Sequence, residues 1–289
     1  MIDDLSSGKY DFIKPWQNHE RFNFVKHSIS YGSNVQEIIP EGAGILLLAS
    51  NPNINLAESN PSIDFDKGTI ITNEVVEASR IRKSPFLIFT SGSGVYGERG
   101  EQILTESDSC IFPISTYASS KIAGESLICA YSKMFGIKSY VFRFGNVVGP
   151  RQTHGVTYDF VKQLKSGNGI LKVLGNGTQS KTYVHVTDVC KAIFKVLEVG
   201  VSENFSIHNV GSDSYITVKE IADLTIEKFN LLNKANISAL YQETDRGWNG
   251  DVPVMRMSTA KIRKLGWYPK YTSSEALQDS INWLINNDF

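Results

Sequence analysis

Runs of apolar residues that end in small or polar residues recur along the first half of the chain and predict buried strands. Residues 43–52, 86–97 and 139–150 each carry such a run, which then breaks into glycine, serine, asparagine or proline. A continuous apolar run is typical of a parallel strand covered on both faces, and the break marks the edge of the sheet where sites form. A shorter run at residues 21–28 predicts one more strand.

Stretches with helical spacing of apolar residues separate these runs. Residues 64–82 predict one helix, and a second is predicted from Tyr117 to its stop at Gly136, because glycine is common just past a helix end. Alternating strands and helices predict a doubly wound, Rossmann-like parallel sheet of the α/β class. The residues that we expect the second helix to bury are Ile122, Ala123, Leu127, Ala130, Met134 and Phe135.

The chain changes character after Pro150. Glycine-asparagine turns at residues 167–169 and 175–177 punctuate shorter elements, and further helices are predicted at residues 185–197 and 216–229. We therefore expect two parts: residues 1–150 as a dinucleotide-binding domain, and residues 151–289 as a smaller mixed C-terminal lobe interleaved with the last elements of the sheet.

Tyr117 and Lys121 are the candidate chemical centre. Residues four apart on a helix share a face, so the ammonium can lie beside the phenol, and we expect it to lower the phenol pKa toward the range of a general acid or base. Such pairs often only solvate a helix face. Here, however, the strands at residues 86–97 and 139–150 flank the helix and place Tyr117 over the carboxyl edge of the sheet.

Short motifs follow one another over the whole chain in a characteristic order. They are Ser91–Gly97, Tyr117 with Lys121, and residues 143–150, 154–160, 174–188, 245–253 and 265–269. One such motif is weak evidence, but the ordered set resembles the extended short-chain dehydrogenase/reductase family, and within it the UDP-glucose 4-epimerase-like enzymes of archaeal type.

The resemblance implies an activity and its partners. It implies C4 epimerisation of a nucleotide sugar, UDP-glucose or UDP-galactose, with tightly bound NAD. Tyr117, helped by Lys121, would remove the hydroxyl proton at C4 while hydride leaves for the nicotinamide, and the keto sugar would turn over before hydride returns. The resemblance also implies a homodimer, with Glu125 as a solvated charge or an interface partner.

Ligand-binding residues are also implied by the resemblance. For the cofactor they are Asp3 as the ligand of the adenosine ribose, Asp4 beside it, Ser6, and Ala49 in a turn that passes close to the cofactor, together with Tyr117 and Lys121. For the substrate they are Arg246 and Lys181 for the diphosphate, Asn146 for the diphosphate or hexose hydroxyls, and Asp251 to bind a ribose or to orient Arg246. Arg246 and Asp251 could equally form only a surface ion pair.

The chain departs from the family pattern at several positions. No G-x-G-x-x-G or related glycine-rich turn is present, so the family's first strand and helix are missing. We expect either that the gene product begins upstream of Met1, which we favour, or that this is a shortened homologue that retains cofactor poorly. Gly92 stands where a serine or threonine hydroxyl is expected, so Ser91 or Ser93 would have to replace it through a turn or bulge. Gly68 stands in place of an asparagine, and His27 in place of an aspartate.

Two alternatives remain open. A sugar-nucleotide dehydratase would need an acidic pair just before Val95, where the chain has Ser93 and Gly94. A non-catalytic nucleotide or nucleotide-sugar binding module is favoured by the missing glycine loop, and opposed by the retained Tyr117, Lys121 and Arg246.

Composition narrows the possibilities further. The chain has 289 residues with a net charge of −1, so no positive field indicates nucleic acid or an anionic membrane. It has no apolar run of about 18 residues and no basic-then-apolar signal region, so cytoplasm is the default. His154 and His185 lack a carboxylate or cysteine cluster, and we predict no metal. The cysteines, predicted to be buried small hydrophobes without disulfides, are Cys110, Cys129 and Cys190.

Overall fold

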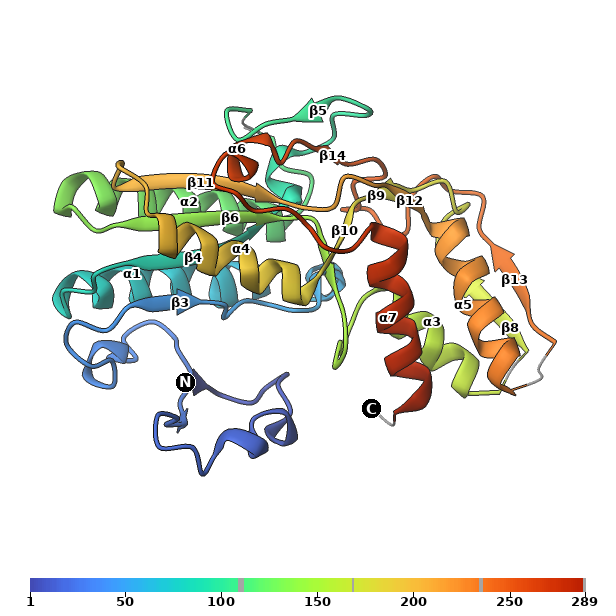
Figure 1. The fold of residues 1–289 in the computed structure, drawn as a ribbon, viewed down its shortest axis with the longest axis horizontal. Coiled ribbons are helices and arrows are strands. Elements are labelled where there is room, and N and C mark those ends of the chain that lie inside the picture. Colours follow the sequence, from blue (N-terminus) through green and yellow to red (C-terminus); the bar gives the residue numbers. More distant parts are fainter. Residues whose placement is uncertain (109–111, 168, 234–235, 288–289) are drawn as a thin grey trace.

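The computed structural model describes residues 1–108, 112–167, 169–233 and 236–287 (Figure 1). Its strands are β1 Ile2–Asp3, β2 Val25–Lys26, β3 Ile45–Leu47, β4 Leu87–Gly92, β5 Ile103–Leu104, β6 Ser139–Phe144, β7 Asn146–Val148, β8 Ile170–Val173, β9 Ser180–Lys181, β10 Tyr183–His185, β11 Phe205–Val210, β12 Ile216–Thr217, β13 Ser238–Tyr241 and β14 Arg256–Met257. Its α-helices are α1 Ile71–Ile81, α2 Thr116–Phe135, α3 Val156–Lys165, α4 Val186–Val199, α5 Val218–Asn233, α6 Ala260–Arg263 and α7 Ser273–Asn286. Short 3-10 or π-helical segments are η1 Tyr10–Phe12, η2 Lys14–Trp16, η3 Val35–Glu37, η4 Ile54–Glu58, η5 Phe65–Ile70 and η6 Ser93–Tyr96.

A parallel four-stranded sheet with the order β11-β6-β4-β3 forms the centre of the fold. Helices α1 and α2 cover one face of the sheet and α4 covers the other, as Figure 1 shows. The predicted doubly wound parallel sheet is therefore confirmed. β11 and α4 both lie after residue 150, so the second half of the chain completes the sheet, and the division at residue 150 stays a prediction.

Alternation along the central strands explains why both faces of the sheet are covered. Ile88 and Phe142 pack in one cluster with α4, whereas Leu87, Phe89 and Val141 pack in another with α1 and α2. Successive strand residues point to opposite faces, so a run in which every position is apolar supplies both clusters.

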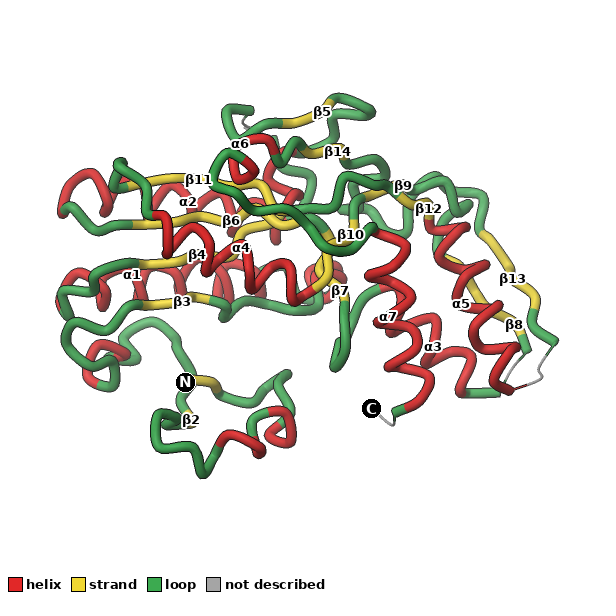
Figure 2. Tube along the Cα trace, viewed as in Figure 1, coloured by secondary structure: helices red, strands yellow, loops and turns green. Residues whose placement is uncertain are grey.

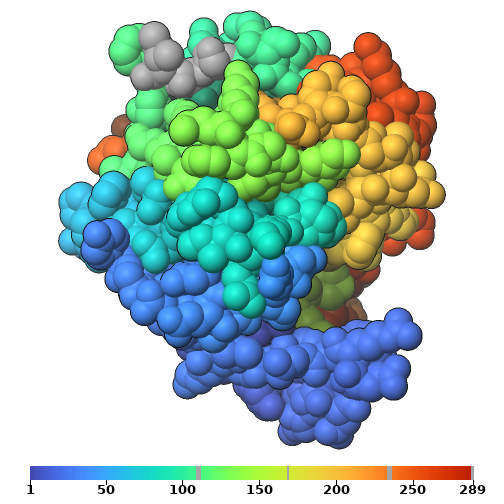
Figure 3. All heavy atoms as spheres, turned by 90° about the vertical axis from the view of Figure 1, so that its left-hand side faces the viewer, coloured from blue at the N-terminus to red at the C-terminus, as the bar shows by residue number. Residues whose placement is uncertain are grey.

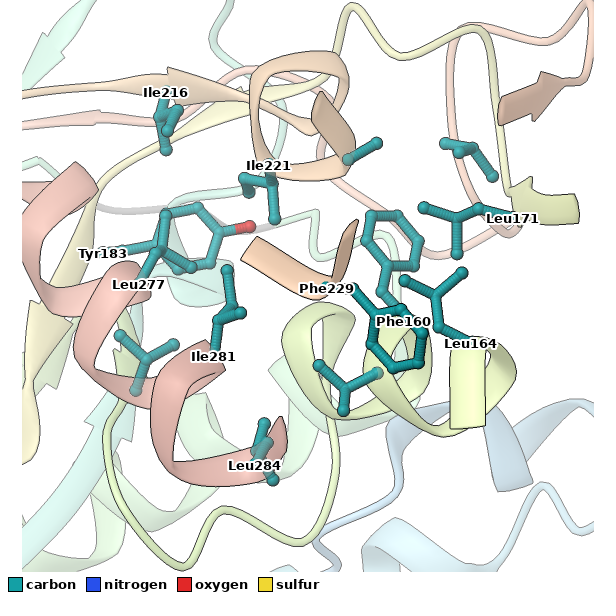
Figure 4. Packing of buried hydrophobic residues seen from close by; sticks show 14 of the residues in the cluster. Phe160, Leu164, Leu171, Tyr183, Ile216, Ile221, Phe229, Leu277, Ile281 and Leu284 are labelled. Atoms are coloured by element: carbon teal, nitrogen blue, oxygen red, sulfur yellow. The ribbon is translucent and has the colours of Figure 1, made fainter. Parts of the chain in front are cut away.

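A second core lies in the C-terminal lobe among α3, α5 and α7 (Figure 4). Phe160, Ile221 and Ile281, one from each helix, are buried there, together with Leu171 of β8 and Tyr183 of β10. β8 pairs in parallel with β13 on the outer side of these helices. This lobe is joined to the central sheet through β10, whose partner β7 directly follows β6.

The N-terminal residues form a small separate unit. Among the described residues, β1 pairs in parallel with β2 alone, with Ile2 opposite Val25, and β3 is an edge of the central sheet. Figure 2 shows this unit as mostly loop, and Figure 3 shows it protruding from the molecule in dark blue. The strand predicted at residues 21–28 is therefore shorter than expected and lies outside the central sheet. On β3 and just after it, Leu46 and Leu48 are 45% and 60% exposed.

The ends of α2 match the prediction, but its buried face does not. The Ser115 side chain caps the start by accepting a hydrogen bond from the Ala118 amide, and Gly136 ends the helix at φ +73°. Of the apolar residues expected in the core, Met134 is 72% exposed and Phe135 47%. The buried residues are instead Ala118, Ser120, Lys121, Gly124, Glu125, Ile128 and Ser132.

The cysteine prediction also needs correction. Cys190 is exposed on α4, and Cys129 on α2 is only partly buried. Cys110 lies outside the described residues.

Within the described ranges, no helix is both long enough and apolar enough to span a membrane.

A buried histidine on β11 predicts a pH-dependent stability. His208 is fully buried, and burial, followed by the charge of Lys261, lowers its pKa to about 4. Because the unfolded chain binds a proton near pH 6.5 and the folded protein does not, the free energy of unfolding falls as pH drops from about 6.5 to about 4, by on the order of 3 kcal/mol. We expect His208→Gln to flatten this dependence in denaturant titrations at several pH values.

The exposed His19 provides the matched control. The His19→Gln variant should keep the wild-type slope between pH 4 and pH 6.5. An unchanged slope in His208→Gln would show that His208 is not the group responsible.

Candidate functional site

The structure brings Tyr117 and Lys121 together in the first turns of α2, over the end of β4. The Lys121 ammonium donates a hydrogen bond to the Thr90 carbonyl at 2.9 Å and lies 5.4 Å from the centroid of the Tyr117 ring. Lys121 is only 3% exposed, and the Tyr117 hydroxyl makes no hydrogen bond to any residue that the structure describes. The phenol therefore has its hydrogen-bonding capacity available for a ligand.

The electrostatics of this pair differ from the sequence-based expectation. Burial, and then the charge of Asp64, raise the pKa of Tyr117 to about 12. Burial lowers the pKa of Lys121 to about 8, against the opposing effects of Asp64 and Glu125. The expectation that the phenol pKa is lowered is thus wrong, because burial and the nearby charge of Asp64 both raise it.

Asp64 is a residue that the sequence reasoning missed. It is 1% exposed, and its carboxylate accepts hydrogen bonds from Asn51 Nδ2 at 2.9 Å and Thr116 Oγ1 at 2.7 Å. An aspartate at the start of a helix is ordinarily read as a capping charge, so the local pattern alone could not distinguish it. Its position beside the turn that carries Tyr117 comes only from the packing of the helical segment 63–81 against α2.

The two serines proposed to replace the hydroxyl missing at Gly92 have different surroundings. Ser91 is 4% exposed and donates its hydroxyl proton to Glu125 Oε1 at 2.6 Å. Gly92 is the extended last residue of β4, and the expected turn begins one residue later, at Ser93 in η6. Ser93 is partly exposed, and its hydroxyl has no partner among the described residues. Ser93 is therefore the candidate whose hydroxyl remains available to a ligand.

Glu125 belongs to a buried network beneath the site and is not a solvated charge. Its carboxylate pairs with Arg143 of β6 through Nε at 3.0 Å and Nη2 at 2.7 Å, and both side chains are below 10% exposed. Burial acts against the charge of Arg143, but the hydrogen bonds and charge of Glu125 raise the pKa of Arg143 overall. Arg143 also lies over the Tyr96 ring, whose hydroxyl donates to Asn209 at 2.6 Å. The helix thus buries polar residues because their partners lie on the strands beneath it.

Packing against α2 explains the glycine at position 68. A Cβ atom on Gly68 would lie 2.6 Å from Ser120 Oγ and 2.8 Å from Ser120 Cβ. Ser120 is on the turn between Tyr117 and Lys121. An asparagine at position 68 would therefore displace the turn that carries both residues. In this chain the space that its side chain would need is filled by the close contact between η5 and α2.

The basic and acidic residues expected to bind the nucleotide lie together, but with different partners from those predicted. Lys181 forms an ion pair with Asp251, which also accepts a hydrogen bond from the Gly247 amide at 3.3 Å. Arg246 pairs instead with Asp245 at 3.1 Å and with Glu98 at 3.3 Å. Asp251 therefore orients Lys181, and the idea that it orients Arg246 is wrong.

The loop at residues 246–251 also reaches the start of α2. A Cβ atom on Gly250 would lie 3.0 Å from Ser115 Cβ, at the residue that caps α2. Nearby, burial raises the pKa of Tyr183 to about 12, while a hydrogen bond to the Asn146 side chain acts in the opposite direction and Asp251 adds to the rise. Asn146, Lys181 and Asp251 therefore share one region, next to the start of α2.

Comparison with known proteins decides the family. Residues 4–211 match the family described as the NAD dependent epimerase/dehydratase family. The chain belongs to this family.

Relatives and solved structures within the epimerase/dehydratase family span most of the chain. A putative UDP-glucose 4-epimerase of Methanocaldococcus jannaschii is 27% identical over 294 residues, covering 100% of this chain and 90% of the relative. Human dTDP-D-glucose 4,6-dehydratase is 30% identical over 225 residues, covering 76% of this chain and 61% of the relative. The UDP-glucose 4-epimerase of Thermus thermophilus in complex with NAD superposes with a TM-score of 0.83 at 25% identity, covering 99% of this chain and 90% of that one. The extended short-chain dehydrogenase/reductase fold expected from the motifs is confirmed.

Residues that fit the two ends of the family's dinucleotide are present. Asp3 ends β1 and accepts a hydrogen bond from the Leu5 amide at 2.7 Å. Asp4 accepts from the Ser6 amide at 2.9 Å and the Ser28 hydroxyl at 3.0 Å. Hydrogen bonding by Ser6, set against a smaller opposing effect of burial, lowers the Asp4 pKa, so the carboxylate is charged at neutral pH. An acid after a strand suits a ribose, as Tyr117 and Lys121 suit the nicotinamide end.

For the pyrophosphate in the middle of the dinucleotide, the described residues offer no comparable binding site. Ala49 is exposed just after β3, at the same end of the sheet as Ser93. The described residues contain no glycine-rich turn whose amides could hold a pyrophosphate. The chain thus fits NAD at its ribose and nicotinamide ends.

Two cavities lie away from the residues around Tyr117. One of about 390 Å³ is in the C-terminal lobe between Tyr215, Glu220 and Thr272, and one of about 270 Å³ is in the N-terminal unit beside Tyr10. Among the described residues, no group of three histidine, cysteine, aspartate or glutamate side chains could hold a metal ion. The candidate site is therefore identified by the side chains around Tyr117, and neither of these two cavities nor a metal cluster marks it.

Proposed function

We propose that the protein interconverts UDP-glucose and UDP-galactose by epimerisation at C4, with NAD as its cofactor. The observation that carries this proposal is the juxtaposition of Tyr117, with its unpartnered hydroxyl, and Lys121, fixed to the Thr90 carbonyl, beside the loop at residues 246–251. The family membership supports the reaction type, and the relatives named UDP-glucose 4-epimerase support the substrate.

The chain's own residues account for the proton transfers. Bound NAD would supply a reversible acceptor for the hydride from C4. Tyr117 takes the proton from the sugar hydroxyl and returns it after the keto sugar has turned over. Lys121, held by one of its three N–H groups at the Thr90 carbonyl, would have the other two available for the ribose of a bound cofactor and for the phenol. The Ser93 hydroxyl supplies the further hydrogen bond to the sugar that Gly92 cannot give.

The C-terminal lobe would hold the nucleotide. A diphosphate would displace the carboxylate partners of Arg246 and Lys181, because phosphate oxygens accept the same paired or single N–H bonds. Asn146 would bind a diphosphate or hexose oxygen, and Asp251 a ribose hydroxyl. Asp3, Asp4, Ser6 and Ala49 would contact the cofactor.

A second candidate is a protein that binds a nucleotide sugar without converting it. The specific observation in its favour is the absence of a glycine-rich turn from the described residues. A 4,6-dehydratase is less well supported than these two functions, because Ser93 and Gly94 offer no carboxylic acid to protonate a leaving hydroxyl. A dehydratase is nevertheless among the relatives.

A paired binding and turnover experiment tests the proposal. The purified chain is titrated calorimetrically with NAD and with UDP, and its conversion of UDP-galactose to UDP-glucose is assayed with added NAD. We expect both ligands to bind and epimerisation to occur. Binding of UDP without NAD binding or turnover would identify the non-catalytic module, and formation of a 4-keto-6-deoxy sugar would identify the dehydratase.

We also propose that the protein is a cytoplasmic homodimer, divided near residue 150 into cofactor and substrate parts. The exposed apolar residues on α1 and α2 support the dimer, since Ile81, Met134 and Phe135 are 45%, 72% and 47% exposed.

A further inference from the structure

Asp64 is a buried carboxylate to which the reaction described above assigns no role. Its side chain is 1% exposed, yet both hydrogen bonds that it accepts come from uncharged groups, the Asn51 amide and the Thr116 hydroxyl. Within the described part of the chain, no lysine, arginine or histidine forms an ion pair with it. Burying a carboxylate without a counter-charge is unfavourable, and a cation at longer range would offset this cost.

Lys121 is the cation placed to do so. Asp64 is hydrogen-bonded to Thr116, which opens α2, and Lys121 lies on the next turn of the same helix with its ammonium also buried. Lys121 in turn has no carboxylate within ion-pair distance among the described residues, and its recorded hydrogen bond goes to a neutral carbonyl. The site thus contains a buried carboxylate and a buried amine whose hydrogen bonds, among the residues that the structure describes, go to neutral groups.

We propose that Asp64 is a positioning residue of this site, anchored by Asn51 and Thr116, whose carboxylate supplies a negative charge at the start of the helix that carries Tyr117 and Lys121. The proposal rests on the proposed function for its catalytic meaning, but the electrostatic coupling that it describes exists in the free protein. It adds a third titratable group to a site for which the sequence indicated two.

The other charges around Lys121 support this assignment. Asp64 and Glu125 are the anions that oppose the effect of burial on Lys121. The charge of Glu125 is already matched by Arg143 through two hydrogen bonds, so Asp64 is left as the unmatched anion. The same carboxylate raises the pKa of Tyr117, so that the site holds a charged amine beside a protonated phenol at neutral pH.

Two variants separate the charge of Asp64 from its hydrogen bonds. Asp64→Asn removes the charge but leaves an amide that can bond to Asn51 and Thr116. Thr116→Val removes one hydrogen bond but leaves the charge. The titration of Lys121 is followed by NMR of lysines labelled at the side-chain ε carbon, and Lys121→Arg identifies its signal.

We expect the wild-type midpoint near pH 8 and a fall of about one pH unit in Asp64→Asn, because an opposite charge at close range stabilises an ammonium by this amount or more. Thr116→Val should titrate close to the wild type. An unchanged midpoint in Asp64→Asn, or an equal shift in both variants, would overturn the proposal.

A measurement on the wild type covers the case in which Asp64→Asn does not fold. The carboxyl carbon signal of Asp64 should move as Lys121 loses its proton, with the same midpoint, and a signal that does not respond would overturn the coupling. Neither NMR measurement depends on turnover. If the wild type proves inactive, the proposed function fails while the role of Asp64 can still be confirmed. If it is active, the pH profile of Asp64→Asn should shift relative to the wild type, whereas that of Thr116→Val should not.

Discussion

Tyr117→Phe is expected to reduce epimerisation by about 10²- to 10⁴-fold while leaving nucleotide-sugar binding nearly unchanged, because the ring remains but the transferable proton is lost. The Tyr117 hydroxyl makes no hydrogen bond to the described residues, so its removal leaves no buried group unsatisfied and the melting temperature should stay close to that of the wild type. Turnover is measured with UDP-galactose, and binding by calorimetry with UDP.

Tyr131 on the same helix offers the matched control. It is partly buried and packs against Phe135, far along α2 from Tyr117. Tyr131→Phe should retain wild-type turnover. Full activity in Tyr117→Phe would remove Tyr117 from the mechanism and with it the proposed chemistry.

The pKa of Tyr117 adds a pH dependence to the same experiment. With a value of about 12, the phenol is protonated at neutral pH and only a small fraction is available as a base. We therefore expect wild-type turnover to rise with pH through the neutral range as this fraction grows. The rise should be absent from any residual activity of Tyr117→Phe.

Glu125→Gln is expected to have the largest effect on stability, a loss of about 3–5 kcal/mol in the free energy of unfolding. The carboxylate accepts from Ser91 and from two nitrogens of Arg143, and all three side chains are buried. An amide cannot neutralise the guanidinium, which would then remain charged and buried without its counter-ion. Urea titration measures the change.

A second bidentate pair in the same protein provides the control. Glu77 and Arg80 on α1 are joined by hydrogen bonds of 2.6 and 2.8 Å, but their side chains are 37% and 41% exposed. Glu77→Gln should cost less than about 1 kcal/mol, because solvent screens an exposed pair. Equal losses in the two variants would show that burial does not determine the cost of breaking the Glu125–Arg143 pair.

The candidate site combines residues from distant parts of the sequence, and this limited what could be predicted. The spacing of Tyr117 and Lys121 indicated their shared face correctly, since four residues make about one helical turn. Spacing could not show that Asp64 lies beside them or that the Lys121 ammonium is buried. The shift of the Tyr117 pKa was consequently predicted in the wrong direction.

The sequence by itself determined the elements whose signals are local. Apolar runs predicted three of the four strands of the central sheet, β3, β4 and β6, but not β11, and Gly136 predicted the end of α2, because residues near in sequence impose strand and helix conformations directly. The ordered motifs likewise indicated the family that the comparisons confirmed.

Only the tertiary structure decided which polar side chains are buried and with what partner. Glu125 meets Arg143 on a neighbouring strand, Lys181 meets Asp251 from 70 residues away, and Asp64 reaches Thr116 from 52 residues away. A polar residue can be buried at low cost only when such a partner satisfies it, and the partner is supplied by packing between elements. The apolar spacing therefore predicted burial at Met134 and Phe135, which are exposed, whereas hydrogen bonds and charges from other elements account for the burial of Lys121 and Glu125.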